Sequence, residues 1–291
     1  MSISTETIKL LRESTGAGIL DCKKALQETD GDMDKAIEYL RKKGLAAAAK
    51  KASREAKDGL VSAHISADGK TAVMVEVNCE TDFVARTDDF QQFVAALVRQ
   101  VAANRQLNSA EALLAAPFID NPGKTVAEYL NELIAKLGEN MIVRRVARFD
   151  LDETGMLDHY IHFGGRVGVL IEVAGSTAAN SKFAGLVHDL ALHIAAASPR
   201  YVTVQDVPAE AAEAEKSIYR GQLAEDKKPD NIKEKIIEGK LKKWYEEIVL
   251  VEQPFVKDND LTVAQLLEKY GKELGSPLQV RRFARFELGA N

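Results

Sequence analysis

The chain has 291 residues, of which 46% are hydrophobic, enough for ordinary globular cores in about two domains. Its 39 lysines and arginines against 44 aspartates and glutamates give a net charge of -5, which argues against a general nucleic-acid-binding protein. No apolar run approaches the ~20 residues of a membrane span, and the N-terminus lacks a secretory pattern. We therefore expect a cytoplasmic protein with no nucleic-acid or membrane partner.

The first 54 residues predict a bundle of three short helices and a linker. Apolar residues recur at helical spacing between 4 and 43, with turns near 15–18 and 29–32. Gly44 is expected to end the third helix, and the alanine- and lysine-rich segment 45–57 is expected to form an exposed linker helix. Gly16 and Gly18 do not make a phosphate-binding loop, because no strand precedes them and the lysine–serine ending is missing.

Residues 55–151 predict a first α+β unit. Alternating apolar residues indicate strands at 59–66 and 71–78, joined by a hairpin turn at Asp68-Gly69. Helices are expected at about 88–103 and 125–137, and a third strand at about 142–150. A hairpin, two helices and one later strand favour an antiparallel sheet over a parallel βαβ arrangement.

The same unit occurs again in residues 152–291. Residues 59–77 align without a gap with 155–173 at an offset of 96. Residues 125–151 align with 262–288 at an offset of 137, with 13 of 27 positions identical. The sequence therefore predicts a duplicated α+β core.

The two copies differ in the loop that follows the second strand. The helical residues 90–101 match 183–194 at an offset of 93, so the second copy lacks three residues here. The first copy carries Asp82-Phe83 in this loop, whereas the second reads Gly-Ser-Thr-Ala-Ala at 175–179. A lone phenylalanine usually packs into its own core, but a loop needed only for folding is expected in both copies. We therefore predict that Asp82 and Phe83 form a contact site.

The second copy also contains an insertion. From Ala196 to Thr262 the chain runs 66 residues, against 22 from Ala103 to Thr125. The insertion, about 209–250, predicts two amphipathic helices, Ala209–Glu225 and Ile232–Leu250, joined by a proline turn. This helical hairpin is expected to be an arm for dimerisation or a partner, or to fold on its own core.

We find no catalytic constellation in the sequence. Neighbouring residues on a strand or helix do not face each other, so the pairs Asp158-His159 and His188-Asp189 do not suggest chemistry. His162 lies in a hairpin turn and is expected to be an exposed contact residue. The arginine pairs 144–145 and 281–282 belong to the repeated unit, and we expect a structural role for them.

The two cysteines, Cys22 and Cys79, are too few for a disulfide framework and lack metal-ligand spacing. Both are expected to be small buried residues in a reducing compartment. No metal or other cofactor is expected.

Residues 12–26 (RESTGAGILDCKKAL) and 76–86 (EVNCETDFVAR) resemble the two signature motifs of the bacterial elongation factor Ts family. The resemblance extends through the repeat, the insertion and residues 253–256. It implies a guanine-nucleotide exchange factor, not an enzyme, whose partner is elongation factor Tu in its GDP-bound and nucleotide-free forms. It also implies an N-terminal bundle like a ubiquitin-associated domain, a two-part α+β core and a coiled-coil hairpin.

The resemblance implies a set of partner-binding residues. Asp82 and Phe83 would wedge between two helices of the partner's nucleotide domain, near its magnesium site. The remaining contacts would come from Thr81, Val84, Lys23, Lys51, Leu137, Gly138, His162, Val256 and Lys257. The chain departs from the family pattern at Leu137, where isoleucine is common, at Lys257, where methionine occurs, and at Phe163, which lengthens the turn after His162.

Two other functions stay open, and so does a homodimer. One is a plain binding module, in which the first bundle captures a peptide or ubiquitin-like partner without any effect on nucleotide release. The other is a thiol enzyme that uses Cys79, although Glu76 and Glu80 nearby would raise the pKa of that thiol.

Overall fold

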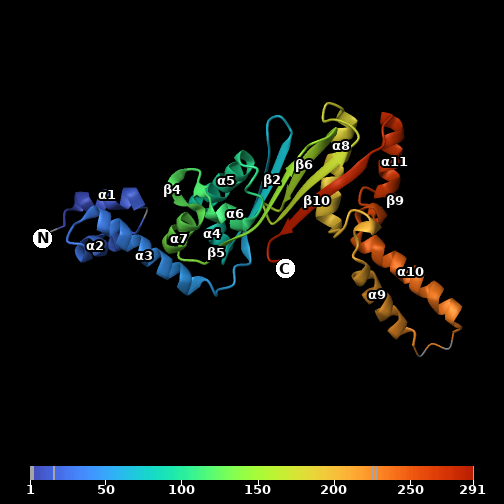
Figure 1. The fold of residues 1–291 in the computed structure, drawn as a ribbon, viewed down its shortest axis with the longest axis horizontal. Helices are drawn as coiled ribbons and strands as arrows, with labels where there is room; N and C mark the ends of the chain where they lie inside the picture. Colours follow the sequence, from blue (N-terminus) through green and yellow to red (C-terminus); the bar gives the residue numbers. More distant parts are fainter. Residues whose placement is uncertain (1–2, 16, 225, 227, 291) are drawn as a thin grey trace.

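Three parts follow one another along the long axis of the molecule: a three-helix bundle, a core with two sheets, and a projecting helical arm (Figure 1). The computed structural model describes residues 3–15, 17–224, 226 and 228–290. The N-terminal bundle and the arm lie at opposite ends, and the chain finishes beside the core.

The bundle consists of three helices, α1 (Thr5–Thr15), α2 (Ile19–Glu28) and α3 (Met33–Lys51). Its small core buries five residues: Leu11, Cys22, Ala25, Leu26 and Ala36. Asp32 begins α3, since its carboxylate accepts a hydrogen bond from the backbone N–H of Lys35 at 3.1 Å. The three predicted helices are therefore present.

The predicted end of the third helix at Gly44 is wrong, and so is the separate exposed helix after it. Helix α3 continues to Lys51 because its second half packs on α7 (Val126–Leu137). Gly44 is buried there, and a Cβ on it would be in van der Waals contact with the Cβ of Ala135, at 3.9 Å. Ala48 is also buried against the core. Packing against α7 thus outweighs the ~1 kcal/mol that a mid-helix glycine costs.

Each copy of the repeat forms its own three-stranded antiparallel sheet, as the duplication predicts. The first has the order β1-β2-β5 and the second β10-β7-β6. Gly59 pairs with Asn78 in the first sheet and Gly155 with Ala174 in the second, so the register repeats at the same offset of 96. The strand bounds are β1 (Asp58–Ile65), β2 (Thr71–Cys79), β5 (Met141–Asp150), β6 (Gly155–His162), β7 (Val167–Ala174) and β10 (Gln279–Glu287).

Helices cover one face of each sheet. Helices α5 (Asp88–Ala103) and α7 belong to the first sheet, and α8 (Ser181–Ala197) and α11 (Val263–Leu274) to the second (Figure 1). The first core buries Val73, Val75 and Val77, the alternating residues of β2, against α5. Short elements that the sequence did not predict complete the chain: α4 (Asp82–Ala85), α6 (Ala110–Ala115), β3 (Pro117–Phe118), β4 (Asn121–Thr125), η1 (Val204–Asp206), η2 (Leu250–Glu252), β8 (Pro254–Phe255) and β9 (Asp258–Thr262).

The other faces of the two sheets pack against each other. The buried residues between them come from both copies and match at the repeat offsets, as with Met74 and Leu170 or Phe149 and Phe286. The backbone joins the copies as well, since the N–H of Val61 donates to the carbonyl of Gly165 at 2.8 Å. The duplication therefore produces a core with approximate twofold symmetry.

Two arginines cross this interface in matching ways. Arg145 donates to the buried carboxylate of Glu76 at 2.6 Å, lies over the ring of Phe286, and donates to the carbonyl of Glu287 at 3.1 Å. Arg282 makes the equivalent bond to the Glu172 carboxylate at 2.6 Å. It lies over the ring of Phe149 and donates to the carbonyl of Asp150 at 3.0 Å. The predicted structural role of these arginines is confirmed.

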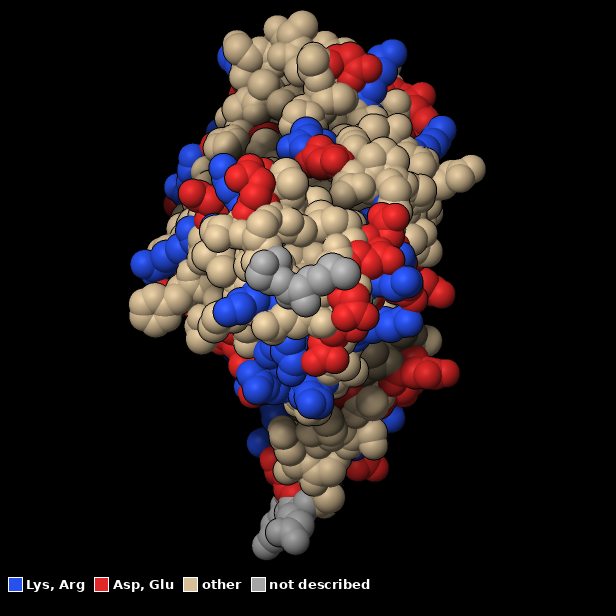
Figure 2. Space-filling view, turned by 90° about the vertical axis from the view of Figure 1, so that its left-hand side faces the viewer, with Lys and Arg blue, Asp and Glu red and all other residues tan. Residues whose placement is uncertain are grey.

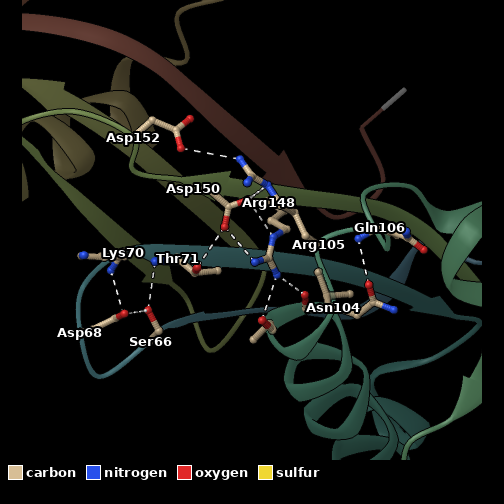
Figure 3. A network of polar contacts seen from close by, with 12 residues as sticks. Ser66, Asp68, Lys70, Thr71, Asn104, Arg105, Gln106, Arg148, Asp150 and Asp152 are labelled. Carbon is tan, nitrogen blue, oxygen red and sulfur yellow. Dashed lines mark hydrogen bonds and ion pairs between the residues drawn. The ribbon is translucent and has the colours of Figure 1, made fainter.

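A second repeated arginine ties each sheet to its first helix. The guanidinium of Arg148 donates to both oxygens of Asp150, at 3.0 and 2.8 Å, and to the last carbonyls of α5 (Figure 3). Thr71 also donates to Asp150, at 2.9 Å. Burial alone would raise the pKa of Asp150, but these hydrogen bonds outweigh it and lower the pKa. In the second copy Arg285 donates in the same way to the carbonyl of Ala195, in the last turn of α8.

The insertion forms a two-helix arm that projects from the second repeat (Figure 1). Its helices are α9 (Ala209–Gln222) and α10 (Asp230–Ile248), close to the predicted ranges. The base of the arm is not separate from the core, because Leu250 is fully buried with the residues of the second sheet. Val249 and Ile248 form a further cluster with Val207 at the foot of α9.

Replacing Arg145 by alanine should destabilise the protein strongly. The substitution leaves the Glu76 carboxylate, which has no exposed surface, without its partner, and such a loss costs about 3–5 kcal/mol. Arg144→Ala, on the exposed side of the same strand, is the matched control and should cost under about 1 kcal/mol. Urea unfolding of the three proteins measures the difference. Equal unfolding free energies for the two variants would contradict this role of Arg145.

Replacing residues 215–240 by a short glycine–serine turn should leave a cooperative melt. This change removes the distal arm but keeps Trp244 and the cluster at its base. Leu250→Ala should instead cost about 2–5 kcal/mol, because Leu250 is a core residue. Calorimetry distinguishes the cases, and loss of the cooperative transition in the shortened protein would show that the distal arm completes the fold.

Candidate functional site

The loop that carries Asp82-Phe83 is a one-turn helix, α4, rather than an open turn. Thr81 precedes it, and the Thr81 hydroxyl accepts a hydrogen bond from the backbone N–H of Val84 at 3.4 Å. Arg86 closes the turn with an ion pair to the Asp82 carboxylate at 2.8 Å. The turn thus has an ordered backbone of its own.

The side chains of this turn point to opposite environments. Phe83 is 79% exposed, so it is not a core residue, and the Asp82 side chain beside it is 46% exposed. Val84 is buried among the core residues of the first repeat. Val84 therefore anchors the turn, while Asp82 and Phe83 are presented to solvent.

The predicted contact residues Leu137 and Gly138 lie next to this turn. Gly138 ends α7 with a left-handed backbone, at a φ of 85°. The following residue, Glu139, accepts three hydrogen bonds from the segment before α4. They come from the backbone N–H groups of Glu80 at 3.1 Å and Thr81 at 3.0 Å, and from the Thr81 hydroxyl at 2.6 Å.

The connection between these segments is reciprocal. The Glu80 carboxylate accepts from the backbone N–H of Asn140 at 2.6 Å, and the Asn140 side chain donates to the carbonyl of Arg54 at 2.8 Å. Lys51, another predicted contact residue, is half-buried at the end of α3 and lies three residues before Arg54. Hydrogen bonds thus bring together the end of α3, the segment before α4 and the turn after α7.

Sequence reasoning missed Glu80, Glu139 and Asn140. The repeat held the signal, because the turn Gly138-Glu139-Asn140 of the first copy corresponds to Gly275-Ser276-Pro277 in the second. Glu139 and Asn140 occur in the copy that also has the Asp82-Phe83 turn, and the other copy lacks both features.

A second group of predicted contact residues surrounds α8 in the second repeat. His162 is half-buried rather than exposed, because its Nδ1 atom lies 2.7 Å from the Tyr160 hydroxyl at the end of β6. Phe163 is 73% exposed and its ring lies tilted against that of His162, with ring centroids 3.7 Å apart. On the other side of α8, Lys257 forms an ion pair with Asp189 at 2.6 Å, and Val256 is 42% exposed.

The histidine and aspartate pairs on β6 and α8 do make one contact that the sequence did not predict. Within each adjacent pair the two side chains do not bond to each other, as expected, although the backbone N–H of His159 donates to the Asp158 carboxylate at 2.7 Å. Across the elements, however, His188 Nδ1 lies 3.0 Å from the Asp158 carboxylate. Burial lowers the pKa of His159, the neighbour of Asp158.

Val256 is held by a buried histidine. Its backbone N–H donates to His193 Nδ1 at 3.2 Å, and His193 Nε2 lies 3.0 Å from the side-chain oxygen of Gln253. Nδ1 is thus an acceptor and Nε2 a donor, which makes the ring neutral. Burial lowers the pKa of His193, and the bond to Gln253 opposes the shift only in part. In the first copy the equivalent residue is Gln100, whose side-chain oxygen accepts a hydrogen bond from the backbone N–H of Ile119 at 3.0 Å.

Lys23 is exposed on α2, in the bundle and apart from both groups. Over this end of the molecule acidic and basic side chains are interspersed (Figure 2). The predicted contact residues therefore occupy three places: the bundle, the edge around α4 in the first repeat, and the surroundings of α8 in the second.

The environment of Cys79 argues against thiol chemistry. The thiol is fully buried and donates to the carbonyl of Thr81 at 3.1 Å. Burial, together with the nearby Glu139 carboxylate, raises its pKa to about 12, so the reactive thiolate is scarce. Within residues 3–15, 17–224, 226 and 228–290 no cluster of three histidine, cysteine or acidic side chains is placed to hold a metal ion.

Comparison with known proteins identifies the family. A family model described as Elongation factor TS matches residues 80–290, which include the α4 turn, most of both repeats and the arm. The chain belongs to the elongation factor Ts family. This is a family of translation elongation factors, and the resemblance of the two sequence motifs to it is confirmed.

Relatives in the elongation factor Ts family match nearly the whole chain. The "Elongation factor Ts" proteins of Trichlorobacter lovleyi and Clostridium perfringens are each 49% identical, over 99% of this chain and 93% of their own length. That of Aquifex aeolicus is 45% identical over 99% of both chains. These alignments also include the N-terminal bundle. None of the described helices is long and apolar enough to cross a membrane.

Replacing His193 by glutamine should reduce the loss of stability in acid. The pKa of His193 is lower in the folded protein than its ordinary value of 6.5, so the unfolded chain binds the proton more tightly. The contribution of neutral His193 to the unfolding free energy is therefore complete above pH 6.5. It is lost as the pH falls from 6.5 through the lower pKa of the folded protein. Glutamine, which the first copy uses at the equivalent Gln100, does not titrate. Urea unfolding at a series of pH values tests this, with the exposed His64→Gln as control. An unchanged acid slope in His193→Gln would contradict it.

Proposed function

We propose that this protein is a guanine-nucleotide exchange factor that binds elongation factor Tu and accelerates its release of GDP. The observation that carries the proposal is Phe83, a large aromatic side chain that is 79% exposed beside Asp82 on an ordered turn. Burial of such a ring is worth about 1.5–3 kcal/mol, which is gained only when a partner covers it. Membership of the elongation factor Ts family supports an elongation factor as that partner.

The proposed mechanism needs no covalent chemistry from this chain. A GTPase holds its nucleotide mainly through phosphate contacts and Mg²⁺. Insertion of the Phe83 ring and the Asp82 carboxylate between helices near that site displaces the elements that hold the ion, so GDP dissociates faster. The coupling is reciprocal: the factor weakens nucleotide binding, and incoming nucleotide weakens binding of the factor.

The other predicted residues supply binding rather than displacement. Thr81 and Val84 hold the turn, the first as its cap and the second as its anchor. Affinity comes from the three contact areas around it, through Lys23, Lys51, Leu137, Gly138, His162, Val256 and Lys257. These areas lie on separate parts of an elongated molecule, which suits a partner of several domains.

One observation favours a second candidate, a binding module without exchange activity. Ile19 and Leu20, at the start of α2, are 56% and 81% exposed and offer an apolar contact on the bundle. This alternative predicts that the protein binds a partner but leaves its GDP release unchanged. A homodimer through the arm, where Ile218 is 54% exposed, remains a prediction.

Phe83→Ala should lower the rate of GDP release about tenfold or more while the melting temperature barely moves. Exposed side chains contribute within about 0.5 kcal/mol to folding, but each 1.4 kcal/mol lost from the displaced-nucleotide complex reduces the rate by one decade. Asp82→Ala should have a smaller effect, because a partly exposed anion loses less than a covered ring.

The measurement is release of fluorescent GDP from elongation factor Tu, beside a melting curve on the same samples. Lys269→Ala, at an exposed residue of α11 outside the predicted contact areas, is the control and should leave both the release rate and the melting temperature unchanged. If Phe83→Ala releases GDP as fast as the wild type does, the wedge is rejected. If the wild type does not accelerate GDP release at all, the binding module is the remaining function.

A further inference from the structure

The Asp82-Phe83 turn has few contacts of its own to fix its direction. Phe83 is largely exposed, and the Asp82 side chain forms its ion pair with Arg86, inside the same segment. The position of the turn therefore depends on its two ends. Val84 anchors one end by burial, and Thr81 begins the other.

The Thr81 end is held by Glu139. The carboxylate is an acceptor only, so the Thr81 hydroxyl must donate its proton to it, at 2.6 Å. The hydroxyl lone pairs are then free to accept the N–H of Val84 and cap α4. The other carboxylate oxygen accepts both backbone N–H groups of Glu80 and Thr81. Glu139 thus orients the entry to α4 and its cap, while the Cys79 thiol holds the carbonyl of Thr81 at 3.1 Å.

Glu139 also joins the turn to a second predicted contact segment. It directly follows Leu137 and Gly138, so the hydrogen bonds to Thr81 hold that turn and α4 in one arrangement. The bond from Asn140 N–H to the Glu80 carboxylate reinforces it from the opposite direction. The two segments lie more than 50 residues apart in the chain, yet they form one edge.

The second repeat indicates that this arrangement is not needed for folding. Its equivalent turn reads Gly275-Ser276-Pro277, with no carboxylate, and its loop at 175–179 carries no acid–aromatic pair. The sheet and helices around it are nevertheless the same. The carboxylate and the wedge occur together in the first copy only.

We propose that Glu139 is a positioning residue for nucleotide exchange: it pre-orders the Asp82-Phe83 turn against the Leu137-Gly138 turn, so that the partner meets one rigid edge. This inference rests on the proposed exchange function. When a contact segment is already ordered in the free protein, binding does not have to include the entropy cost of ordering it. Without Glu139, the turn keeps its residues but samples other orientations.

The first test measures the turn in the free protein. Hydrogen exchange of the backbone amides of Thr81, Val84 and Ala85 is compared in the wild type and in Glu139→Ala. We expect at least tenfold faster exchange at these amides in the variant, and unchanged exchange in β2. Unchanged protection of the α4 amides would overturn the positioning role without reference to any partner.

The second test measures GDP release from elongation factor Tu. Glu139→Ala should lower the efficiency of release about tenfold, with a melting temperature close to that of the wild type. Glu139→Gln, which retains one acceptor oxygen for the backbone N–H groups, should recover part of the rate. Ser276→Ala, at the equivalent place in the second repeat, is the matched control and should change nothing. If Glu139→Ala does not fold, Glu139→Gln is compared with the wild type instead.

A double variant, Glu139→Ala with Phe83→Ala, tests whether Glu139 acts by positioning the wedge or by disturbing the fold in general. If Glu139 acts through the wedge, the double variant should exchange no more slowly than Phe83→Ala alone. The inference would be overturned if the double variant lost as much release efficiency as the two single variants combined. It would also be overturned if Glu139→Ala released GDP as efficiently as the wild type. If the wild type itself does not accelerate GDP release, the exchange function fails, and hydrogen exchange still decides whether Glu139 orders α4.

Discussion

Two arginines at the interface between the sheets join the two repeats of this protein. Arg145 and Arg282 each neutralise a carboxylate of their own repeat, Glu76 and Glu172, and each reaches an aromatic ring and a backbone carbonyl of the other repeat. A buried carboxylate is costly without its partner, so the pairs favour the single arrangement in which each carboxylate meets its arginine. The long apolar stems of the arginines let them make these contacts within a packed interface.

The duplicated core acts as a scaffold on which each copy carries a different addition. The first copy has the α4 turn with its exposed Phe83, held by Glu139. The second has the arm, and a neutral His193 where the first uses Gln100. Since both copies fold into the same sheet with the same register, the additions are best explained by function.

The arrangement also explains how an elongated protein can hold its proposed contact areas in a defined geometry. Helix α3 crosses α7 through Gly44, so the bundle is attached to the first repeat by packing and not by a loose linker. The hydrogen bonds among Arg54, Glu80 and Asn140 continue that attachment to the edge of α4. A shift of the bundle is therefore resisted at the same edge that carries the proposed wedge.

The sequence by itself determined the duplication, the antiparallel hairpins, the helical arm and the Asp82-Phe83 turn, because residue periodicity and the comparison of two internal copies need no knowledge of distant contacts. Only the tertiary structure decided that α3 continues through Gly44, since a glycine looks like a helix end until the surface that it touches is known. The same holds for Glu139 with Thr81 and for His188 with Asp158. These partners are 58 and 30 residues apart, and only the packing of the elements between them brings them within hydrogen-bonding distance.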